Sequence, residues 1–257
     1  MPFKSGPRKF IFRSPNMLSI YNKTMNDLLF LTEYPEILAG FTLAEEDNPV
    51  RRERMERELE EKGKTLVWPR QVHSDIVVAI RKEDLRPGQI EIPSIDATVT
   101  DLPGVRLISS HADCLPIYMY DPAKHAIGLA HSGWRGCLAG IGVNMLRKME
   151  REYGCSPEDV AVYIGPGIGY CCFEVDRDVM EAFTERYPWA EDEYVLSKGG
   201  GKYHIDLKGI VSEYLQMEGI EQISIDPRCT CCGGEAFWSY RRNGTKYRHM
   251  AYMELKE

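Results

Sequence analysis

The centre of the chain, from residue 65 to residue 130, is a series of short segments that each have the composition of a β-strand. Each segment is rich in β-branched residues or alternates apolar and polar residues, and proline, glycine or aspartate separates one segment from the next. The segments cover residues 65–68, 75–80, 96–100, 105–109, 115–120 and 125–130. Segments of this length build sheets rather than helical bundles, so this region predicts a sheet-rich core.

Capped and amphipathic segments predict helices around this core. Asn48-Pro49 places a cap residue before a proline suited to the first helical position, so we expect a helix over residues 50–62 that Gly63 ends. Apolar residues spaced by three and four predict one continuous helix from residue 134 to about 153. Further helices are expected over 176–187 and 206–217, and further strands over 160–164, 222–225 and 249–255. Because strands and helices do not alternate strictly, we predict an α+β fold with mixed sheets and flanking helices.

Length and composition favour a single compact domain over residues 1–257. With 43% hydrophobic residues, a chain of this length can bury a sizeable core. The formal net charge is −7 and no long basic block is present, so nucleic acid is not expected as a partner. No segment has the apolar length of an export signal or a membrane span, which predicts a cytoplasmic protein without membrane contact. Nothing specifies an interface, and we expect a monomer or a weak dimer.

Three residues at the ends of central strands have the chemistry of zinc ligands. They are His73, which follows Pro69; Cys114, which precedes Leu115-Pro116; and His131, which lies in a glycine-rich turn. Each of them alone suits a buried cysteine or a hydrogen-bonded core histidine. Together they form a three-ligand set that leaves the fourth tetrahedral position of Zn²⁺ open for water or substrate. We therefore predict His73, Cys114 and His131 as metal ligands and catalytic residues.

Two aspartates and one further histidine lie close to these ligands in the sequence. Asp75 and Asp113 could each accept the second ring N–H of a ligating histidine, but both also suit turns, and their spacing does not decide between the two roles. His111 is three residues from Cys114, and residues at odd separations on a strand point to opposite faces. We therefore do not expect His111 to be a ligand.

The remaining cysteines and one glycine-rich loop raise the question of further sites. Cys171-Cys172 and Cys229-Thr230-Cys231-Cys232 lack the Cys-x-x-Cys spacing of closed zinc knuckles, so we expect core or near-site thiols rather than a structural zinc. Eight cysteines in 257 residues suit reduced thiols rather than a disulfide scaffold. The loop Gly165-Pro166-Gly167-Ile168-Gly169 could bind an anion, although ordinary tight turns have the same composition.

Cationic side chains near the C-terminus suit an anionic substrate group. Arg241, Arg242 and Arg248 gather in one short region, and guanidinium groups bind phosphate or carboxylate in a bidentate manner. The alternative is a solvated turn with an acidic neighbour such as Glu235. We predict Arg241 and Arg248 as substrate-binding residues, together with Arg135 in the turn that follows His131.

From about residue 66 to its C-terminus, the chain resembles the laccase-domain, YfiH-type family. The matching pieces are Gln71-Val72-His73, Asp96-Ala97, Ala112-Asp113-Cys114, His131-Ser132-Gly133-Trp134-Arg135-Gly136, Gly165-Pro166-Gly167-Ile168, Tyr170-Cys171-Cys172 to Glu174-Val175, and Ser239-Tyr240-Arg241-Arg242. Residues 1–64 form a divergent N-terminal region, in which the segment 40–47 is shorter than in the family and lacks one of its arginines. Near the C-terminus, Lys246-Tyr247-Arg248 keeps only the arginine of the family's Thr-Gly-Arg.

The resemblance implies a fold related to bacterial cysteine-hydrolase-like toxin domains, with zinc held by His73, Cys114 and His131. It also implies a purine nucleoside phosphorylase that cleaves adenosine, inosine, guanosine and methylthioadenosine with phosphate, and that has adenosine deaminase as a side activity. Some relatives are linked instead to peptidoglycan editing. This leaves as an alternative a Cys-His amidase that acts on a cell-wall precursor, with Cys114 as nucleophile and His131 or His73 as base. The third hypothesis is a metal-binding module without enzymatic activity.

An older label of the family, polyphenol oxidase, can be tested by counting ligands. A multicopper oxidase needs a blue-copper site and a three-copper cluster, which together use roughly ten histidines. The chain has six. We therefore exclude a multicopper cluster, while a single copper ion in the His-His-Cys set remains possible as a replacement for Zn²⁺ and could give weak oxidase activity.

Overall fold

The computed structural model describes residues 34–44 and 48–256. Residues 1–33, 45–47 and 257 lie outside this description, and so does much of the divergent N-terminal region. The same holds for the N-terminal segment 1–6, on which the expectation of no export signal partly rests. Among the residues that are described, no helix has both the length and the apolar character needed to span a membrane.

A six-stranded mixed sheet forms the centre of the described chain, in the order β13-β9-β7-β8-β5-β3. Its strands are β3 (Val77–Ala79), β5 (Ala97–Thr100), β7 (Leu115–Asp121), β8 (Ala126–Ser132), β9 (Ala161–Ile164) and β13 (Gln222–Ile225). Along β7, Leu115 and Ile117 face one side of the sheet, and Tyr118 and Tyr120 face the other. Both faces are buried, which explains why this segment is apolar without interruption. All six strands were predicted from the sequence, with ends that shift by a few residues.

A five-stranded sheet packs against the centre, in the order β1-β14-β6-β2-β4. Its strands are β1 (Ile37–Phe41), β2 (Thr65–Arg70), β4 (Gly88–Pro93), β6 (Val105–His111) and β14 (His249–Leu255). The two strands that the sequence analysis did not predict, β1 and β4, are the two edges of this sheet. β4 begins at a glycine, ends at a proline and is only partly buried, so its local apolar signal is weak.

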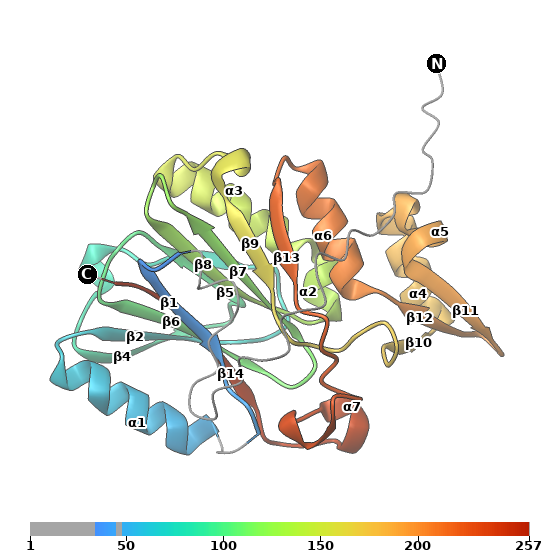
Figure 1. The fold of residues 1–257 in the computed structure, drawn as a ribbon, viewed down its shortest axis with the longest axis horizontal. Coiled ribbons are helices and arrows are strands. Elements are labelled where there is room, and N and C mark those ends of the chain that lie inside the picture. The colour runs from blue at the N-terminus through green and yellow to red at the C-terminus, as the bar shows by residue number, and fades with distance from the viewer. Residues whose placement is uncertain (1–33, 45–47, 257) are drawn as a thin grey trace.

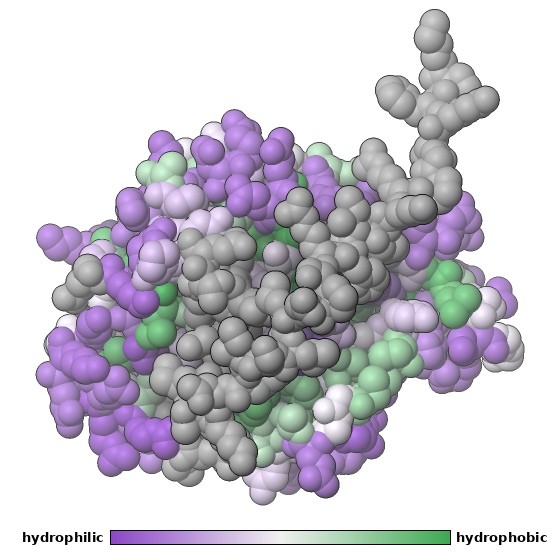
Figure 2. All heavy atoms as spheres, viewed as in Figure 1, coloured by the Kyte–Doolittle hydropathy of each residue, from purple (hydrophilic) through white to green (hydrophobic). Residues whose placement is uncertain are grey.

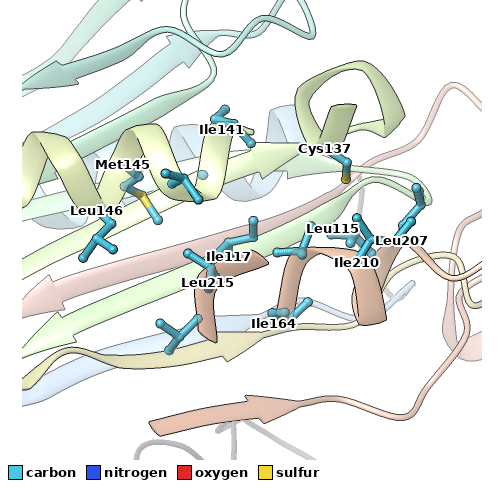
Figure 3. Close-up of a cluster of buried hydrophobic side chains, with 14 of the residues drawn as sticks. Leu115, Ile117, Cys137, Ile141, Met145, Leu146, Ile164, Leu207, Ile210 and Leu215 are labelled. Atoms are coloured by element: carbon cyan, nitrogen blue, oxygen red, sulfur yellow. The ribbon is translucent and has the colours of Figure 1, made fainter. Parts of the chain in front are cut away.

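Helices cover the outer faces of both sheets and give four layers (Figure 1). On the six-stranded sheet lie α2 (Trp134–Ala139), α3 (Ile141–Tyr153) and α6 (Leu207–Met217). Ile141 and Met145 of α3 and Ile210 of α6 meet Ile117 of β7 in one buried cluster (Figure 3). On the other side, α1 (Asn48–Glu61) places Leu59 against the five-stranded sheet. Figure 2 shows hydrophilic side chains over the outer surfaces of α1 and α3, as expected for helices that cover a core from outside.

The helix expected from residue 134 to 153 is two helices, so the prediction of one continuous helix is wrong. Gly140 lies between α2 and α3 in the left-handed conformation, with φ 79°, and its N–H donates to the carbonyl groups of Gly136 and Cys137. A glycine adopts this conformation without steric cost, so it ends α2 and redirects the chain into α3. The apolar spacing of three and four continues across the break and conceals it.

A small third sheet extends from one side of the layers (Figure 1). It has the order β10-β12-β11, and its strands were not predicted: β10 (Glu174–Asp176), β11 (Val195–Gly199) and β12 (Lys202–Ile205). The glycines 199–201 form the tip of the β11–β12 hairpin. The remaining helices are α4 (Arg177–Arg186), α5 (Glu191–Tyr194), α7 (Tyr240–Asn243) and the 3₁₀ turns Lys82–Asp84, Pro157–Asp159, Pro188–Ala190 and Gly234–Ala236. Mixed sheets with flanking helices confirm the predicted α+β class.

Candidate metal centre and pocket

The three predicted metal ligands meet where the two large sheets join. His73 lies in the connection from β2 to β3, Cys114 in the turn from β6 to β7, and His131 near the end of β8. Their candidate ligand atoms all lie within 4.8 Å of one another. Because β2 and β6 belong to the five-stranded sheet while β3, β7 and β8 belong to the six-stranded one, the site lies at crossings between sheets.

Left-handed backbone conformations shape the segments that carry two of these ligands. His73 has φ 62°, and Asp113, directly before Cys114, has φ 87°. Residues other than glycine rarely adopt this region, and such strained positions concentrate at functional sites where the surroundings hold them in place. For Asp113, one restraint is visible because its carbonyl accepts the Ile168 N–H at 2.7 Å.

A single buried carboxylate, Asp96, organises two of the three ligands. Its Oδ1 accepts hydrogen bonds from the His73 N–H at 3.0 Å and from His131 Nδ1 at 2.8 Å. Its Oδ2 accepts from the Val72 N–H at 3.1 Å, and from the N–H and hydroxyl of Ser74 at 2.7 and 2.8 Å. Since His131 uses Nδ1 for Asp96, its Nε2 remains as the atom that can bind a metal.

The charge states of this pair suit metal binding. Burial opposes ionisation of Asp96, but hydrogen bonds from His131 and from Ser74 outweigh it and lower the pKa of Asp96 to about 2. Burial lowers the pKa of His131 below its ordinary value, although Asp96 acts in the opposite direction. At neutral pH, Asp96 is therefore an anion and His131 a neutral imidazole, which is the form that ligates a metal.

Cys114 is a poor nucleophile when no metal is bound. Burial, with smaller contributions from Cys137 and Asp113, raises the pKa of the Cys114 thiol to about 12. Cysteine reacts as the thiolate, and a thiol with this pKa is almost entirely protonated at neutral pH. A metal ion removes the proton from a coordinating thiol, so the site favours Cys114 as a ligand.

His111 is buried and turned to other partners. Its Nδ1 lies 3.0 Å from the Cys114 carbonyl oxygen, and its Nε2 lies 2.7 Å from the Ser109 hydroxyl. Both ring nitrogens therefore have protein partners. The side chain supports the turn that carries Cys114 instead of joining the ligand set. The expectation that His111 is not a ligand therefore agrees with the structure, but its reason does not apply, because Cys114 lies in the turn after β6 and not on the strand itself.

The partner of the ligating histidine is neither Asp75 nor Asp113, which were the two candidates from the sequence. Asp75 accepts from the Asn144 side chain at 2.9 Å. Asp113 accepts from Thr230, Ser239 and the Arg241 backbone. The sequence did contain a signal for Asp96, because a charged residue stands between Ile95 and Ala97 at the head of an apolar strand. Its role depends on β5 lying beside β8, which local spacing does not reveal.

The donor set fits a metal with an open coordination position. Two imidazoles and one thiolate are typical zinc ligands, and among the described residues no fourth histidine, cysteine or carboxylate joins them. All three side chains line a cavity of about 940 Å³. A three-ligand site that faces a cavity of this size is the arrangement of a catalytic metal centre, whereas structural sites are closed by a fourth ligand.

The three predicted substrate-binding arginines all line the same cavity. Arg135 lies over the Trp134 ring, at 4.3 Å from its centroid. Arg241 lies over the Phe173 ring at 5.4 Å. Burial raises the pKa of Cys114 and lowers that of His131, and the positive charge of Arg248 opposes the first shift and adds to the second, so Arg248 lies near enough to act on both ligands.

Aromatic side chains complete the cavity wall, and the sequence analysis assigned them no role. Trp68, Trp134, Phe173 and Tyr240 line it, and the Tyr240 side chain is 64% exposed. Arginines beside flat aromatic rings make a wall that can hold an anionic group and a planar ring at the same time.

Gly133 leaves no room for a side chain beside the ligands. A Cβ atom at this position would lie 2.7 Å from His73 Cδ2 and 3.0 Å from Cys114 Sγ. Because the backbone angles of Gly133 are open to any residue, Gly133→Ala is expected to act through this overlap alone. Overpacking of this kind costs about 1–3 kcal/mol, so we expect a loss of zinc affinity of ~10-fold or more, measured by competition with a chromophoric chelator.

Gly136→Ala provides the matched control for this substitution. A Cβ atom on Gly136 would lie 3.4 Å from the Ser74 carbonyl oxygen, which is an ordinary contact. Gly136 lies in the first turn of α2, the helix that begins directly after Gly133. If the two variants bind zinc with equal affinity, a side chain at position 133 does not disturb the ligands.

Comparisons with known proteins agree with this site. Residues 34–256 match the model of a family described as multi-copper polyphenol oxidoreductase laccase. The chain belongs to this family. Purine nucleoside phosphorylase YlmD of Geobacillus stearothermophilus is 34% identical over 194 residues, which cover 73% of this chain and 71% of that protein. Adenosine deaminase RL5, from an unknown prokaryotic organism, is 33% identical over 185 residues and 70% of each chain.

The fold is shared with solved structures of this laccase family. The crystal structure of Bacillus licheniformis hypothetical protein YfiH matches with a TM-score of 0.79 and 28% identity, and it covers 87% of this chain and 94% of that one. These matches confirm the resemblance drawn from the motifs. The ligand count does not support the multicopper cluster in the family's description, because the whole chain has six histidines and such a cluster uses roughly ten.

Proposed function

We propose that this protein is a zinc-dependent purine nucleoside phosphorylase, with adenosine deaminase as a side activity. Its substrates are adenosine, inosine, guanosine or methylthioadenosine, together with phosphate. The observation that carries the proposal is the three-ligand set His73, Cys114 and His131, which faces a cavity walled by arginines and aromatic rings. Relatives named purine nucleoside phosphorylase and adenosine deaminase support the same substrate class.

Different residues of the chain have different roles in this reaction. When bound, zinc supplies a Lewis acid that activates an oxygen nucleophile, either phosphate or water. Asp96 keeps His131 in one tautomer and holds the His73 turn. The guanidinium groups of Arg135, Arg241 and Arg248 bind the anionic charge of phosphate and stabilise it as it develops in the transition state.

The test is phosphorolysis by purified, zinc-loaded protein, with release of free base and ribose 1-phosphate followed by chromatography. We expect base release from adenosine or inosine to require phosphate, to stop after chelation and to return with zinc. His131→Ala should abolish it, whereas His125→Asn, which removes an exposed histidine with φ 50° that asparagine tolerates, should not. Phosphorolysis that survives in His131→Ala would refute the assignment.

The amidase alternative uses the same residues in other roles and predicts a different result. A Cys114 nucleophile acting on a cell-wall precursor would be active without metal and would be inactivated by alkylation. Activity that is lost on chelation and restored by zinc excludes it. The non-enzymatic reading predicts zinc binding without turnover of any nucleoside in the same assay.

We also propose that the protein works in the cytoplasm as a monomer or weak dimer. All eight cysteines are free thiols, which suits a reducing compartment. Sedimentation of the zinc-loaded protein over a range of concentrations measures the oligomeric state.

A further inference from the structure

Four cysteines outside the candidate active site converge on one point. Cys171 and Cys172 lie in the loop after β9, and Cys229 and Cys232 lie in the loop after β13. Their sulfur atoms all lie within 4.8 Å of one another. The cause is topological, since β9 and β13 are parallel neighbours and their loops leave the sheet at the same edge. A bridge between Gly167 and Cys229 continues this pairing into the loops.

We propose that this cluster, Cys171, Cys172, Cys229 and Cys232, is a second zinc site with four thiolate ligands. Tetrahedral zinc with Zn–S distances of ~2.3 Å places its sulfur atoms roughly 3.8 Å apart. The Cys171 and Cys232 sulfur atoms lie 3.5 Å apart, and all four cysteines are free thiols. Only small adjustments of side chains would therefore close a four-sulfur site.

The backbone around the cluster has the features of a thiolate site. The Gly169 N–H points at Cys229 Sγ at 3.2 Å, a bond that a thiolate accepts well. A Cβ on Gly169 would lie 3.2 Å from both Cys171 Sγ and Cys229 Cβ, so this glycine allows the two loops their close approach. Cys171 and Cys232 are exposed, which gives an ion access from solvent.

The spacing of the cysteines along the chain predicts no structural zinc when each segment is compared with a zinc knuckle separately. Neither segment is a knuckle, but each supplies two ligands to a common point. Cys231, between the ligands of its segment, does not belong to the set. It therefore provides a control thiol in the same loop.

Zinc at this cluster would fix one wall of the active-site cavity. Ile168 and Phe173, on the two sides of Cys171-Cys172, line that cavity. Arg241 Nη1 donates to the carbonyl groups of Cys172 and Glu174 at 3.0 and 2.8 Å. Arg242 Nη1 donates to those of Thr230, Cys231 and Gly234. The clamped loops thus hold α7, which carries both arginines, and the role is structural because the four ligands leave no open position.

Metal analysis of purified, reduced protein tests the proposal. We expect two zinc ions per wild-type chain by elemental analysis, and one in the double variant Cys171→Ser/Cys232→Ser. Cys231→Ser should keep both, and His131→Ala should lose only the ion of the candidate active site, so failure of the proposed function leaves this result intact. One zinc in the wild type, with no further loss in the double variant, would overturn the second site.

Measurements on protein that keeps all four cysteines cover the case in which the double variant does not fold. In the His131→Ala variant, cobalt should give strong sulfur-to-metal charge-transfer absorption with the intensity of four thiolates, and zinc X-ray absorption should show a pure sulfur shell at ~2.3 Å. A Cys171–Cys232 disulfide in protein purified under reducing conditions, detected as a mass loss of two hydrogens without bound zinc, would contradict the proposal.

Discussion

Replacement of Asp96 by asparagine is expected to remove most of the zinc from the candidate active site and most of the nucleoside phosphorolysis with it. Loss of such a partner lowers metal affinity by about 10–100-fold. The effect should lie at the upper end, because Asp96 supports both His131 and the turn that carries His73. Zinc affinity by chelator competition and kcat/KM for adenosine measure the two consequences.

The asparagine cannot be accommodated in either orientation of its amide. With its NH₂ in the place of Oδ1, it faces the His73 N–H and forces His131 to accept at Nδ1, which protonates the Nε2 needed for the metal. With its NH₂ in the place of Oδ2, it faces the N–H groups of Val72 and Ser74. Each orientation leaves part-buried N–H donors without their acceptor, which costs up to about 1–3 kcal/mol for each such group.

Asp121→Asn separates this effect from a general loss of stability. Asp121 is buried at the far end of β7, where its Oδ1 accepts the N–H groups of Ala123 and Lys124 at 2.8 and 2.9 Å. We expect it to lower the free energy of unfolding but to leave zinc affinity unchanged. If the two variants bind zinc equally well, Asp96 does not position the ligands.

Asp96 also contributes to the acid sensitivity of the fold. Its pKa in the folded state is about 2, below the ordinary value, so the carboxylate stabilises the protein above about pH 4. This contribution is lost as the pH falls from about 4 towards 2. In urea denaturation of metal-free protein, Asp96→Asn should therefore show a weaker dependence of stability on pH in this range than the wild type.

Much of the fold could be predicted because each central strand carries its own signal. The segments that became β5 to β8 alternate or are apolar throughout, and turn residues bound them. The break at Gly140 was missed because the apolar spacing on its two sides remains in phase. The edge strand β4 was missed because it is only partly buried, which weakens its apolar pattern. β1 is apolar and mostly buried, but it contains Ala39 and Gly40, and neither residue type favours strands.

The candidate ligands could be predicted for a related reason, since each stands at a strand end beside turn-forming residues. The contacts that bring these residues together in space could not be predicted. Asp96 reaches His131 because β5 lies next to β8, and the four cysteines meet because β9 lies next to β13. Strand order is set by packing of the whole chain, so residues that act across strands leave little trace in local spacing.

Asp113→Gly is expected to destabilise the protein strongly. The buried carboxylate accepts hydrogen bonds from the Thr230 hydroxyl at 2.7 Å, the Ser239 hydroxyl at 3.0 Å and the Arg241 N–H at 2.6 Å. Hydrogen bonds to charged groups contribute about 1.5–3 kcal/mol each, so we expect a loss of at least ~3 kcal/mol in the free energy of unfolding. For a domain of this size, each kcal/mol corresponds to about 2–4 °C in the midpoint of thermal unfolding.

The choice of glycine, and its comparison with asparagine, separates the lost hydrogen bonds from backbone strain. Asp113 has φ 87°, which glycine and asparagine tolerate and alanine does not. Asparagine can still accept the Arg241 N–H while its NH₂ donates to the Thr230 hydroxyl, which reverses its role. Asp113→Asn should therefore cost far less than Asp113→Gly. Asp113 connects α7 to the turn of Cys114, so the glycine variant should also displace Arg241 and raise the KM for phosphate. If the two variants have the same midpoint of thermal unfolding, these hydrogen bonds do not hold α7 in place.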